Sequence, residues 1–587
     1  MNTVAITNLN YYTFIKSLFI HRDCQVIYFK RTIPGGILNY LKRKKKTRIL
    51  NLDICPKYQL ELDRIVYDTC MKIADHTEIK NLIQRISDAF GIDETRVKNA
   101  VKKHLIQLLE HDVCFYHLVK ESVKDIEEIE FWFEFSNIMK KFVAGKCSIE
   151  HGGRYAIHEL KMSVYMTIWP TFIMVLYLCS LLKRQKHHPV TLLFQQKYGK
   201  RFGWNPEFDA FYRYLQTRDD VLYHCRRRND QIYQSIKDDG KPTISNIDLY
   251  VSFSNAISYF KNLIIAISRN FKLICRMGSI IWFIILSMFK EYVITECLVR
   301  QFKPRYFLRI RTDMYANHPI TTGVCENYGC NNIGYFHGPP VYFQSIRAIV
   351  DFHFIGVMGA YAISNIYKDQ IGDMNCHVMG PITAEIGYDL PFTKNVSKQV
   401  ITFFATSPVY DLNDNVFKEA FSYLVEFVKD KNGYEIVMRD KKYIPDRISF
   451  VNEIIKKYNI DCRFSFSNNG IGPEDFSSSL LKHSDFAVVC SISTAVWECL
   501  SLGTKFMVYL NGHLVHPIEL DEPKLVAKNR QQFHASFIWL WNIGEFEYQN
   551  IVDPIVMKHS KAANGNLVKE FFEDFIGVDR LTADLRN

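Results

Sequence analysis

Apolar runs and amphipathic stretches alternate along the second half of the chain. From about residue 303, short runs rich in Val, Ile, Phe and Tyr alternate with stretches whose apolar residues recur every three or four positions. The first pattern predicts buried parallel strands and the second predicts helices, so together they predict doubly wound α/β sheets. A break at residues 380–398 indicates two such sheets joined by a linker. The expected strands are 305–310, 333–336, 352–357, 377–379, 400–404, 434–438, 462–466, 486–490 and 505–510.

The first 300 residues have a mixed pattern. Strand-like runs at 25–29 and 48–52 precede amphipathic, helix-like stretches between 60 and 145. The 21 residues 162–182 carry no charge and are followed by a cationic stretch, so they are a candidate for a buried helix, an interfacial helix or a membrane span. A second apolar run, 277–289, is too short to span a bilayer, and a buried helix is favoured there.

These patterns predict an order of domains. A chain of 587 residues is too long for one hydrophobic core. We expect residues 1–60 to begin the first doubly wound domain and 61–300 to form a helical, membrane-associated region. Residues 301–385 then complete the first domain, and 386–587 form the second.

Composition adds an expectation about partners. Hydrophobic residues make up 48% and charged residues 23%, which is typical of a folded globular chain. The net charge of +11 is partly local, because Lys and Arg dominate residues 42–48. This block is a surface for anionic lipid or nucleic acid, or else a solvated loop. No zinc-finger spacing, RNA-binding signature or helix-turn-helix pattern accompanies it, so we expect no nucleic-acid partner.

The cysteines and the first residues indicate a reducing compartment. The 15 cysteines show no framework spacing, and the start, Met-Asn-Thr-Val-Ala-Ile, lacks the basic and apolar layout of a secretory signal. We therefore expect a cytoplasmic protein with reduced thiols.

Hydroxyl side chains follow the expected strand 486–490 and open the next helix. Ser491, Ser493 and Thr494 lie where free backbone N–H groups and the positive end of a helix dipole favour an anion. Their hydroxyls are candidates for binding phosphate, and ordinary helix capping is the alternative. Glu498, in the first turns of the same helix, is a candidate contact for the same ligand, and a solvated glutamate is the alternative.

A histidine follows the expected strand 333–336 in a rigid turn. His337 precedes Gly338 and two prolines, a setting that suits a general base or a hydrogen-bond donor to phosphate. A structural turn histidine is the alternative. After the strand 305–310, Asp313 is a second candidate base, although a helix cap explains it as well. Arg311 is expected at the same cleft.

Cations and hydroxyls also follow two strands of the second sheet. Arg439 and Lys441 come at the end of strand 434–438 and are candidates for neutralising phosphate charge. A solvated basic turn is the alternative. Thr406 and Ser407 follow strand 400–404 and are expected to touch the same ligand.

Several common catalytic signatures are missing from the sequence. It contains no Walker A motif, no Gly-x-Gly-x-x-Gly and no Gly-x-Ser-x-Gly, and no Asp-x-Asp follows an expected strand. Kinase, dehydrogenase and hydrolase functions are therefore disfavoured. We expect no cofactor and no metal.

Three segments together resemble a known family. Residues 333–339 (Ile-Gly-Tyr-Phe-His-Gly-Pro) resemble the strand and His-Gly element of bacterial surface-carbohydrate glycosyltransferases with two Rossmann-like domains, the GT-B fold. Residues 354–359 and 376–381 look like their linker pattern, and 491–498 (Ser-Ile-Ser-Thr-Ala-Val-Trp-Glu) are similar to their phosphate-binding loop. The relatives are capsule and lipopolysaccharide transferases that use CMP-Kdo or CMP-sialic acid, and the CDP-glycerol glycerophosphotransferases of teichoic-acid synthesis. The resemblance covers about residues 303–515.

The resemblance implies a function. It implies an inverting glycosyltransferase that takes a sugar from a CMP- or UDP-linked donor, without metal, to a glycan or glycolipid acceptor at the inner face of the membrane. Glu498 would contact the ribose hydroxyls. One departure is that residues 437–442 read Val-Met-Arg-Asp-Lys-Lys, where many relatives carry a Lys-Pro-His-Pro-like stretch. Arg439 or Lys441 would then replace that histidine, and residues 516–517 (His-Pro) are another substitute.

Two other functions remain open from the sequence. A nucleotide-sugar 2-epimerase uses the same double fold but is expected to need more carboxylates near the cleft. A catalytically silent scaffold of a polysaccharide assembly would bind partners without affinity for nucleotides.

Overall fold

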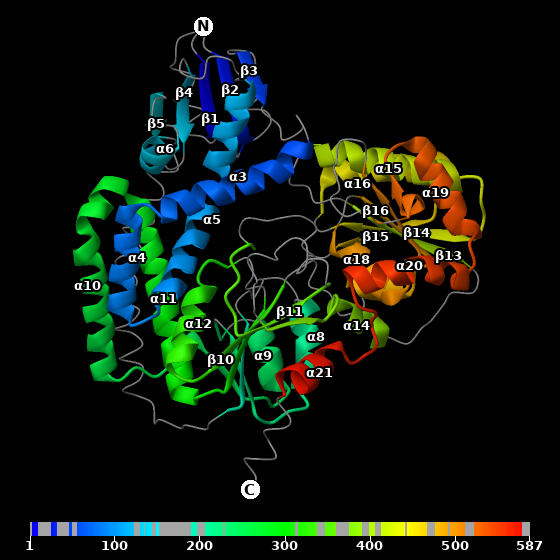
Figure 1. Cartoon of the computed structure of the whole chain (residues 1–587). Coiled ribbons are helices and arrows are strands. Elements are labelled where there is room, and N and C mark those ends of the chain that lie inside the picture. The colour runs from blue at the N-terminus through cyan, green and yellow to red at the C-terminus, as the bar shows by residue number, and fades with distance from the viewer. Residues whose placement is uncertain are drawn as a thin grey trace.

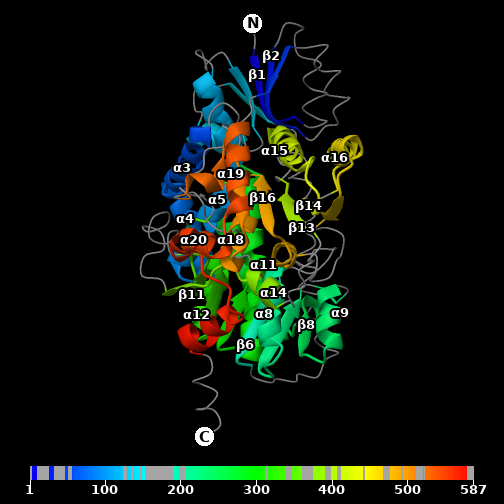
Figure 2. The same cartoon turned by 90° about the vertical axis from the view of Figure 1, so that its right-hand side faces the viewer.

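The computed structural model describes most of the chain and contains three parallel β-sheets, which we call sheets A, B and C (Figure 1). Sheet A lies at the top of Figure 1, sheet B at the bottom and sheet C on the right, and Figure 2 shows the same arrangement from the side. The described residues are 3–9, 25–31, 46–49, 56–122, 129–133, 136–143, 148–151, 190–196, 206–225, 227–228, 231–310, 315–336, 347–359, 375–389, 398–405, 412–440, 443–466, 476–490, 493–510, 520 and 522–577.

Sheet A is a small parallel sheet near the N-terminus. Its strands lie in the order β3-β2-β1-β4-β5, and each neighbouring pair is parallel. The strands are β1 (Thr3–Leu9), β2 (Gln25–Arg31), β3 (Lys46–Ile49), β4 (Ile129–Phe133) and β5 (Ser148–His151). The C-terminal part of the basic block 42–48 therefore lies in a strand rather than in a loop.

Sheet B joins strands from both sides of residue 300. Its order is β12-β11-β10-β9-β6-β7-β8, with all neighbours parallel. In chain order this is 3-2-1-4-5-6-7, the order of a Rossmann-like sheet with one strand added. The strands are β6 (Leu192–Gln196), β7 (Val221–Cys225), β8 (Thr243–Ser245), β9 (Tyr306–Arg309), β10 (Asn331–Tyr335), β11 (Phe354–Val357) and β12 (Asn375–Val378).

This pairing corrects the expected domain order. The strands of 301–385 pair with β6–β8, which lie inside the region 61–300 that was expected to be helical, and the strands of 1–60 belong to sheet A instead. The described parts of β6 and β7 are buried almost throughout, so they appear in the sequence as short apolar runs without alternation. Such runs do not stand out among helical stretches. The apolar pattern of a strand also does not predict which distant strand it pairs with.

Sheet C confirms the second predicted sheet. Its order is β15-β14-β13-β16-β17-β18, again 3-2-1-4-5-6 in chain order and parallel throughout. Sheets B and C together confirm the expected α/β class with two Rossmann-like units. The strands are β13 (Gln399–Phe404), β14 (Tyr434–Asp440), β15 (Cys462–Phe466), β16 (Phe486–Cys490), β17 (Phe506–Tyr509) and β18 (Val526–Ala527).

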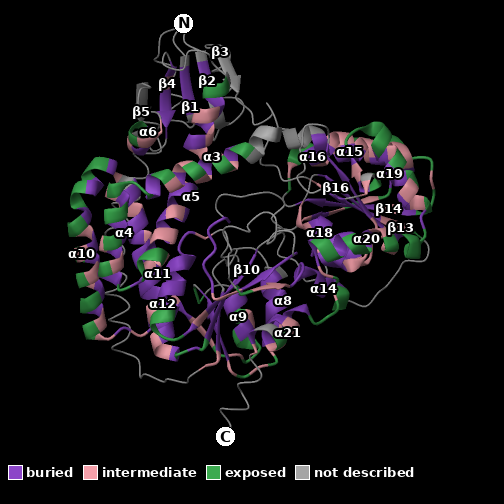
Figure 3. Cartoon of the chain, viewed as in Figure 1, coloured by how far each residue is buried: buried purple, intermediate pink, exposed green. Residues whose placement is uncertain are grey.

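The helices between sheets A and B form one continuous core. Apolar side chains of α3, α4, α5, α10, α11 and α12 pack in a single buried cluster that also reaches strands of both sheets (Figure 3). The helices are α3 (Pro56–Ala74), α4 (Thr77–Phe90), α5 (Glu94–Ser122), α6 (Ser136–Phe142), α8 (Pro206–Leu215), α9 (Gln231–Asp238), α10 (Phe253–Met277), α11 (Ser279–Phe302), α12 (His318–Asn327), α14 (Thr383–Asp389), α15 (Leu412–Val428), α16 (Pro445–Tyr458), α17 (Ser477–Lys482), α18 (Thr494–Leu502), α19 (Arg530–Asn542), α20 (Glu545–His559) and α21 (Leu567–Glu570), with a terminal π-helical turn at Phe571–Ile576.

The two apolar runs have different outcomes. In the run 277–289, Met277 ends α10 and residues 279–289 form the start of α11. Ile281, Ile284 and Ile285 are buried, so the buried-helix interpretation is confirmed. The run 162–182 lies outside the described residues. Among the helices that the structure does describe, none combines the length and the hydropathy that a membrane span requires.

The end of the chain returns from sheet C to sheet B. After α20, residues of α21 and the π-helical turn join the core beneath sheet B, where Phe572 packs against Phe211 and Tyr214 (Figure 1). The crossing is tight, because Gly359 lies so close to the backbone carbonyl of His559 that a Cβ atom would sit 2.1 Å from its oxygen. The expectation that 386–587 forms the second domain alone is therefore wrong for its last residues. Their apolar pattern predicts burial but not which core receives them.

Candidate functional site

Strand order places the candidate site between sheets B and C. In an open α/β sheet, ligands bind beyond the carboxyl ends of the strands, where the strand order reverses. That switch point lies between β6 and β9 in sheet B and between β13 and β16 in sheet C. The predicted site residues that lie outside the described residues, and whose roles stay predictions, are Arg311, Asp313, His337, Gly338, Thr406, Ser407, Lys441 and Ser491.

Ser493 and Thr494 stand at the start of α18, as predicted. Ser493 is the N-cap residue and Thr494 the first helical residue, and both are half-buried. Ser493 does not cap the helix through its hydroxyl. Within the described part of the chain neither hydroxyl is engaged in a hydrogen bond, so both are available to a ligand at the positive end of the α18 dipole.

Glu498 lies one turn further along α18 and is buried. Its Oε1 accepts a hydrogen bond of 2.5 Å from Thr383 Oγ1 at the start of α14, whereas its Oε2 has no hydrogen-bond partner among the described residues. Burial raises the pKa of Glu498 to about 7, and the hydrogen bond from Thr383 opposes that rise. The interpretation of Glu498 as a solvated glutamate is therefore wrong. Its contact with a ribose stays a prediction.

Two further charged groups, Arg439 and Glu207, affect the carboxyl group of Glu498. We call Glu207, Thr383, Arg439 and Glu498 the inter-sheet cluster. The charge of Arg439 lowers the pKa of Glu498 and that of Glu207 raises it, so both groups lie within electrostatic range of the carboxyl group. Glu207 is buried in the first turn of α8, the helix that follows β6 of sheet B. Helix α14 packs against both α8 and α18, which brings the two units together at this cluster.

Arg439 is a buried cation at the end of β14. Its Nη1 donates a hydrogen bond of 2.7 Å to Ser465 Oγ on β15, so it is not part of a solvated turn. The next residue, Asp440, forms a buried ion pair of 3.0 Å with Arg447 at the start of α16. Within this segment, Arg439 is thus the side chain that belongs to the inter-sheet cluster, whereas Asp440 binds the start of α16.

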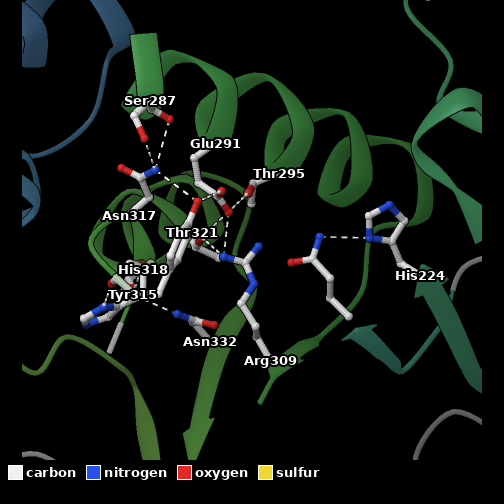
Figure 4. Close-up of polar contacts among 12 residues, drawn as sticks. His224, Ser287, Glu291, Thr295, Arg309, Tyr315, Asn317, His318, Thr321 and Asn332 are labelled. Atoms are coloured by element: carbon white, nitrogen blue, oxygen red, sulfur yellow. Dashed lines mark hydrogen bonds and ion pairs between the residues drawn. The ribbon is translucent and has the colours of Figure 1, made fainter. Parts of the chain in front are cut away.

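A second buried polar cluster lies at the switch point of sheet B (Figure 4). Arg309 ends β9, and its Nη1 lies 2.6 Å from Glu291 Oε1 on α11 and 2.9 Å from Thr321 Oγ1 on α12. Tyr315 donates its hydroxyl at 3.0 Å to the other oxygen of Glu291. The guanidinium of Arg309 is thereby paired with a carboxylate, and both side chains are buried away from water.

This cluster holds both ends of one predicted site segment. Arg309 precedes residues 311–314 and Tyr315 follows them, and both contact Glu291. The segment contains Arg311 and Asp313. Glu291 therefore contacts the residues on either side of this segment.

Gln195 and His224 extend the cluster across the sheet. Gln195 is paired in register with Arg309 on one side and with His224 on the other. The Gln195 Nε2 lies 2.8 Å from His224 Nδ1. Burial lowers the pKa of His224 to about 4, with the charge of Arg309 as a second cause, so its imidazole is neutral at neutral pH.

Sequence reasoning missed Glu207, Gln195, His224 and Glu291. All four lie in the region 61–300, where the strands β6 and β7 were not recognised. The available signal was weak: a proline followed by an acidic residue at 206–207, which is typical of a helix start. Within the described ranges, no group of three or more His, Cys, Asp or Glu residues is placed to hold a metal ion. Independence from metal and from cofactors stays a prediction.

Comparisons with known proteins give similarities without a family assignment. No protein-family model and no curated protein matches the chain. Solved structures that match include that of MnaA from S. aureus with UDP, at 11% identity, 67% of this chain, 98% of that chain and a TM-score of 0.41. The wall teichoic acid polymerase TagF with CDPG matches at 12% identity, 74% and 100% coverage and a TM-score of 0.40. A UDP-GlcNAc 2-epimerase from Neisseria meningitidis matches at 14% identity, 66% and 99% coverage and a TM-score of 0.38.

These structures include a wall teichoic acid polymerase and a 2-epimerase, and a 2-epimerase is one of the functions that the sequence left open. Because each TM-score is below 0.5, we infer neither fold nor function from them. The fold rests on the strand order, and the function on the residues at the switch points.

Proposed function

We propose that this protein is a glycosyltransferase that transfers a sugar from a nucleotide-activated donor to a bacterial surface glycan, without a metal ion. The observation that supports this most is the start of α18. There, two hydroxyls without a hydrogen bond to any described residue stand about one turn from a buried carboxyl group, one oxygen of which also has no described partner, at the switch point of a Rossmann-like sheet. Such a site offers donors for phosphate and an acceptor for sugar hydroxyls.

On the donor side, each group has a separate task. Ser493 and Thr494, with Ser491, would donate hydrogen bonds to the phosphate, and the dipole of α18 would stabilise the negative charge of the departing nucleotide. Arg439 or Lys441 would add positive charge. Glu498 would accept hydrogen bonds from the ribose hydroxyls through its unpartnered oxygen. Thr406 and Ser407 would contact the donor from the end of β13.

On the acceptor side, a base must take the proton of the attacking hydroxyl. His337, directly after β10, is our first candidate and Asp313 the second, with Arg311 and Gly338 lining the same cleft. Attack from the side opposite the leaving nucleotide inverts the anomeric carbon. The acceptor is a glycan or glycolipid, and we propose that the protein works in the cytoplasm at the surface of the inner membrane.

The first test is a thermal-shift panel of the full-length protein with CMP, CDP, UDP, GDP and ADP, without added metal. A nucleotide at roughly 100 times its Kd stabilises the folded state by about 3 kcal/mol, so a single responding base identifies the donor class. The double variant Ser493→Ala, Thr494→Val should lose most of this shift while keeping the melting temperature of the ligand-free protein. A panel without any shift would instead support the silent scaffold.

The base assignment has its own test. His337→Ala should abolish turnover and retain the nucleotide-induced shift, because the histidine acts on the acceptor and not on the donor. Turnover in His337→Ala would contradict the assignment, and Asp313 would then be the candidate base to test.

A second candidate function gains from one observation. A nucleotide-sugar 2-epimerase is expected to need additional carboxylates near the cleft, and Glu207 is a second buried carboxylate whose charge raises the pKa of Glu498. Isomerisation of a UDP-sugar in the absence of any acceptor, and its loss in Glu207→Gln, would favour this function over glycosyl transfer.

A further inference from the structure

Helix α10 exposes a stripe of large apolar side chains. It lies at the outer edge of the molecule, away from sheet C (Figures 1 and 3). Ile257, Ile264 and Phe271 are 51%, 63% and 59% exposed and lie seven residues apart, which is close to two helical turns and places them on one side of the helix. Phe253 continues the stripe at the N-terminal end. The opposite side packs into the core through Ala256, Tyr259, Leu263, Ala266, Leu273 and Ile274.

The charges of α10 are all positive. Its 25 residues contain four cations and no carboxylate. Arg269 and Arg276 reach back to Asp88 and Glu78 on α4. Lys261 and Lys272, which flank the stripe, are exposed and form no ion pair within the described part of the chain. The outer face therefore combines apolar side chains with lysines that have no ion-pair partner among the described residues.

We propose that this face of α10 binds the surface of an anionic lipid bilayer. A helix that carries bulky apolar residues on one side, with lysines beside them, binds in the interface by burying the apolar stripe and placing the cations against lipid phosphates. The inference adds a surface to the proposed function, whose acceptor is expected at a membrane, but it does not depend on nucleotide binding.

Charge argues against the two other occupants. In a two-fold dimer the same surface meets itself, so the lysines of one copy would lie near those of the other without any acid on α10 to compensate them. The apolar run 162–182 of the same chain carries no charge and would leave Lys261 and Lys272 unpaired. Of these three occupants, only an anionic lipid surface covers the apolar stripe and also neutralises Lys261 and Lys272.

The test is sedimentation of the full-length protein with vesicles of phosphatidylcholine alone or mixed with phosphatidylglycerol. The double variant Ile264→Glu, Phe271→Glu removes the stripe, and Lys261→Gln, Lys272→Gln removes the flanking charge. The matched control is Phe546→Glu, because Phe546 is 80% exposed on α20 beside sheet C. Nucleotide-induced thermal shifts of each variant report separately on the donor site.

We expect the wild type and the control to bind the anionic vesicles and to bind less tightly as salt rises. The stripe variant should bind at least about tenfold more weakly, since each lost side chain buries enough apolar surface for about that factor. The lysine variant should lose most of the salt dependence. If no nucleotide shifts the melting temperature but the vesicle-binding results are as expected, the proposed function is overturned and the membrane-binding proposal is supported.

Three results would overturn the membrane face. The first is a wild type that does not bind, or a stripe variant that binds as well as the control. The second is a wild-type dimer in light scattering that the stripe variant dissociates, which would assign the face to a second copy. The third is a lower melting temperature of the stripe variant with unchanged vesicle binding, which would mean that another part of this chain covers the stripe.

Discussion

Replacing Glu498 by Gln tests the electrostatics of the inter-sheet cluster. Glutamine has nearly the same shape and keeps a side-chain oxygen that accepts the hydrogen bond from Thr383 Oγ1. It cannot ionise. The substitution therefore removes one property alone, the negative charge that the buried carboxyl group acquires when it loses its proton.

The expected magnitude follows from the pKa of Glu498. Burial, opposed by Thr383 and Arg439, raises that pKa from 4.5 to about 7. Because the folded state holds the proton more tightly than the unfolded chain, the wild type loses stability as pH rises from 4.5 through 7. Each whole step of pKa corresponds to about 1.4 kcal/mol, so the loss is about 3 kcal/mol at pH 8. Below pH 4.5 the carboxyl group is neutral in both states and no loss remains.

The assay is urea unfolding of the full-length protein at pH 5 and at pH 8. Fluorescence of the buried Trp497, next to Glu498, contributes to the signal. Glu498→Gln should be stabilised by about 3 kcal/mol relative to the wild type at pH 8 and by less than about 1 kcal/mol at pH 5. The control Glu453→Gln changes the same charge at an exposed position of α16 and should show no such difference.

Equal effects of Glu498→Gln at the two pH values would refute the reasoning, because the carboxyl group would then ionise in the folded state as it does in water. The same variant also bears on function. If Glu498 accepts hydrogen bonds from the ribose, Glu498→Gln stabilises the ligand-free protein at pH 8 and weakens nucleotide binding in the same buffer. Strain of this kind is typical of binding sites.

Two further predictions concern the supports of the site. Glu291→Ala leaves the guanidinium of Arg309 buried without its carboxylate and should lower the free energy of unfolding by about 3–5 kcal/mol; urea unfolding that differs from the wild type by less than about 1 kcal/mol would contradict it. Gly359→Ala places a Cβ atom 2.1 Å from the carbonyl oxygen of His559, so it should lower the melting temperature and expose the C-terminal crossing to limited proteolysis. In Gly544→Ala, where a Cβ atom has open space, both measurements should match the wild type.

Local patterns sufficed for much of sheet C and for part of the candidate site. The predicted strands at 400–404, 434–438, 462–466 and 486–490 are present, since each is a short apolar run between turn residues. Thr494 and Glu498 lie on the helix that was predicted for them, and Ser493 is its N-cap residue. Their position at the start of this helix could be predicted because it depends on a strand and a helix that are adjacent in the chain.

The rest of the site could not be predicted, for a physical reason. Glu207 and Glu498 are 291 positions apart, and the charge of one affects the pKa of the other because α14 packs against both of their helices. Glu291 reaches Arg309 because α11 covers the face of sheet B on which that side chain points. Contacts between distant segments depend on which sheet each strand joins. A buried strand has the same apolar pattern whichever sheet it joins, so the pattern does not predict these contacts.

By itself, then, the sequence determined the kind of element at most positions after residue 303 and the chemistry available at their ends. Those properties follow from the spacing of side chains along one segment. The tertiary structure alone decided that strands of 190–245 join the same sheet as the strands from 306 onward, and that residues 567–577 return to it. It also decided that a glutamate on α18 and another on α8 are both buried and interact electrostatically. Long-range packing decides which side chains are removed from water. It raises the pKa of Glu498 by burying it, and it leaves the stripe on α10 exposed.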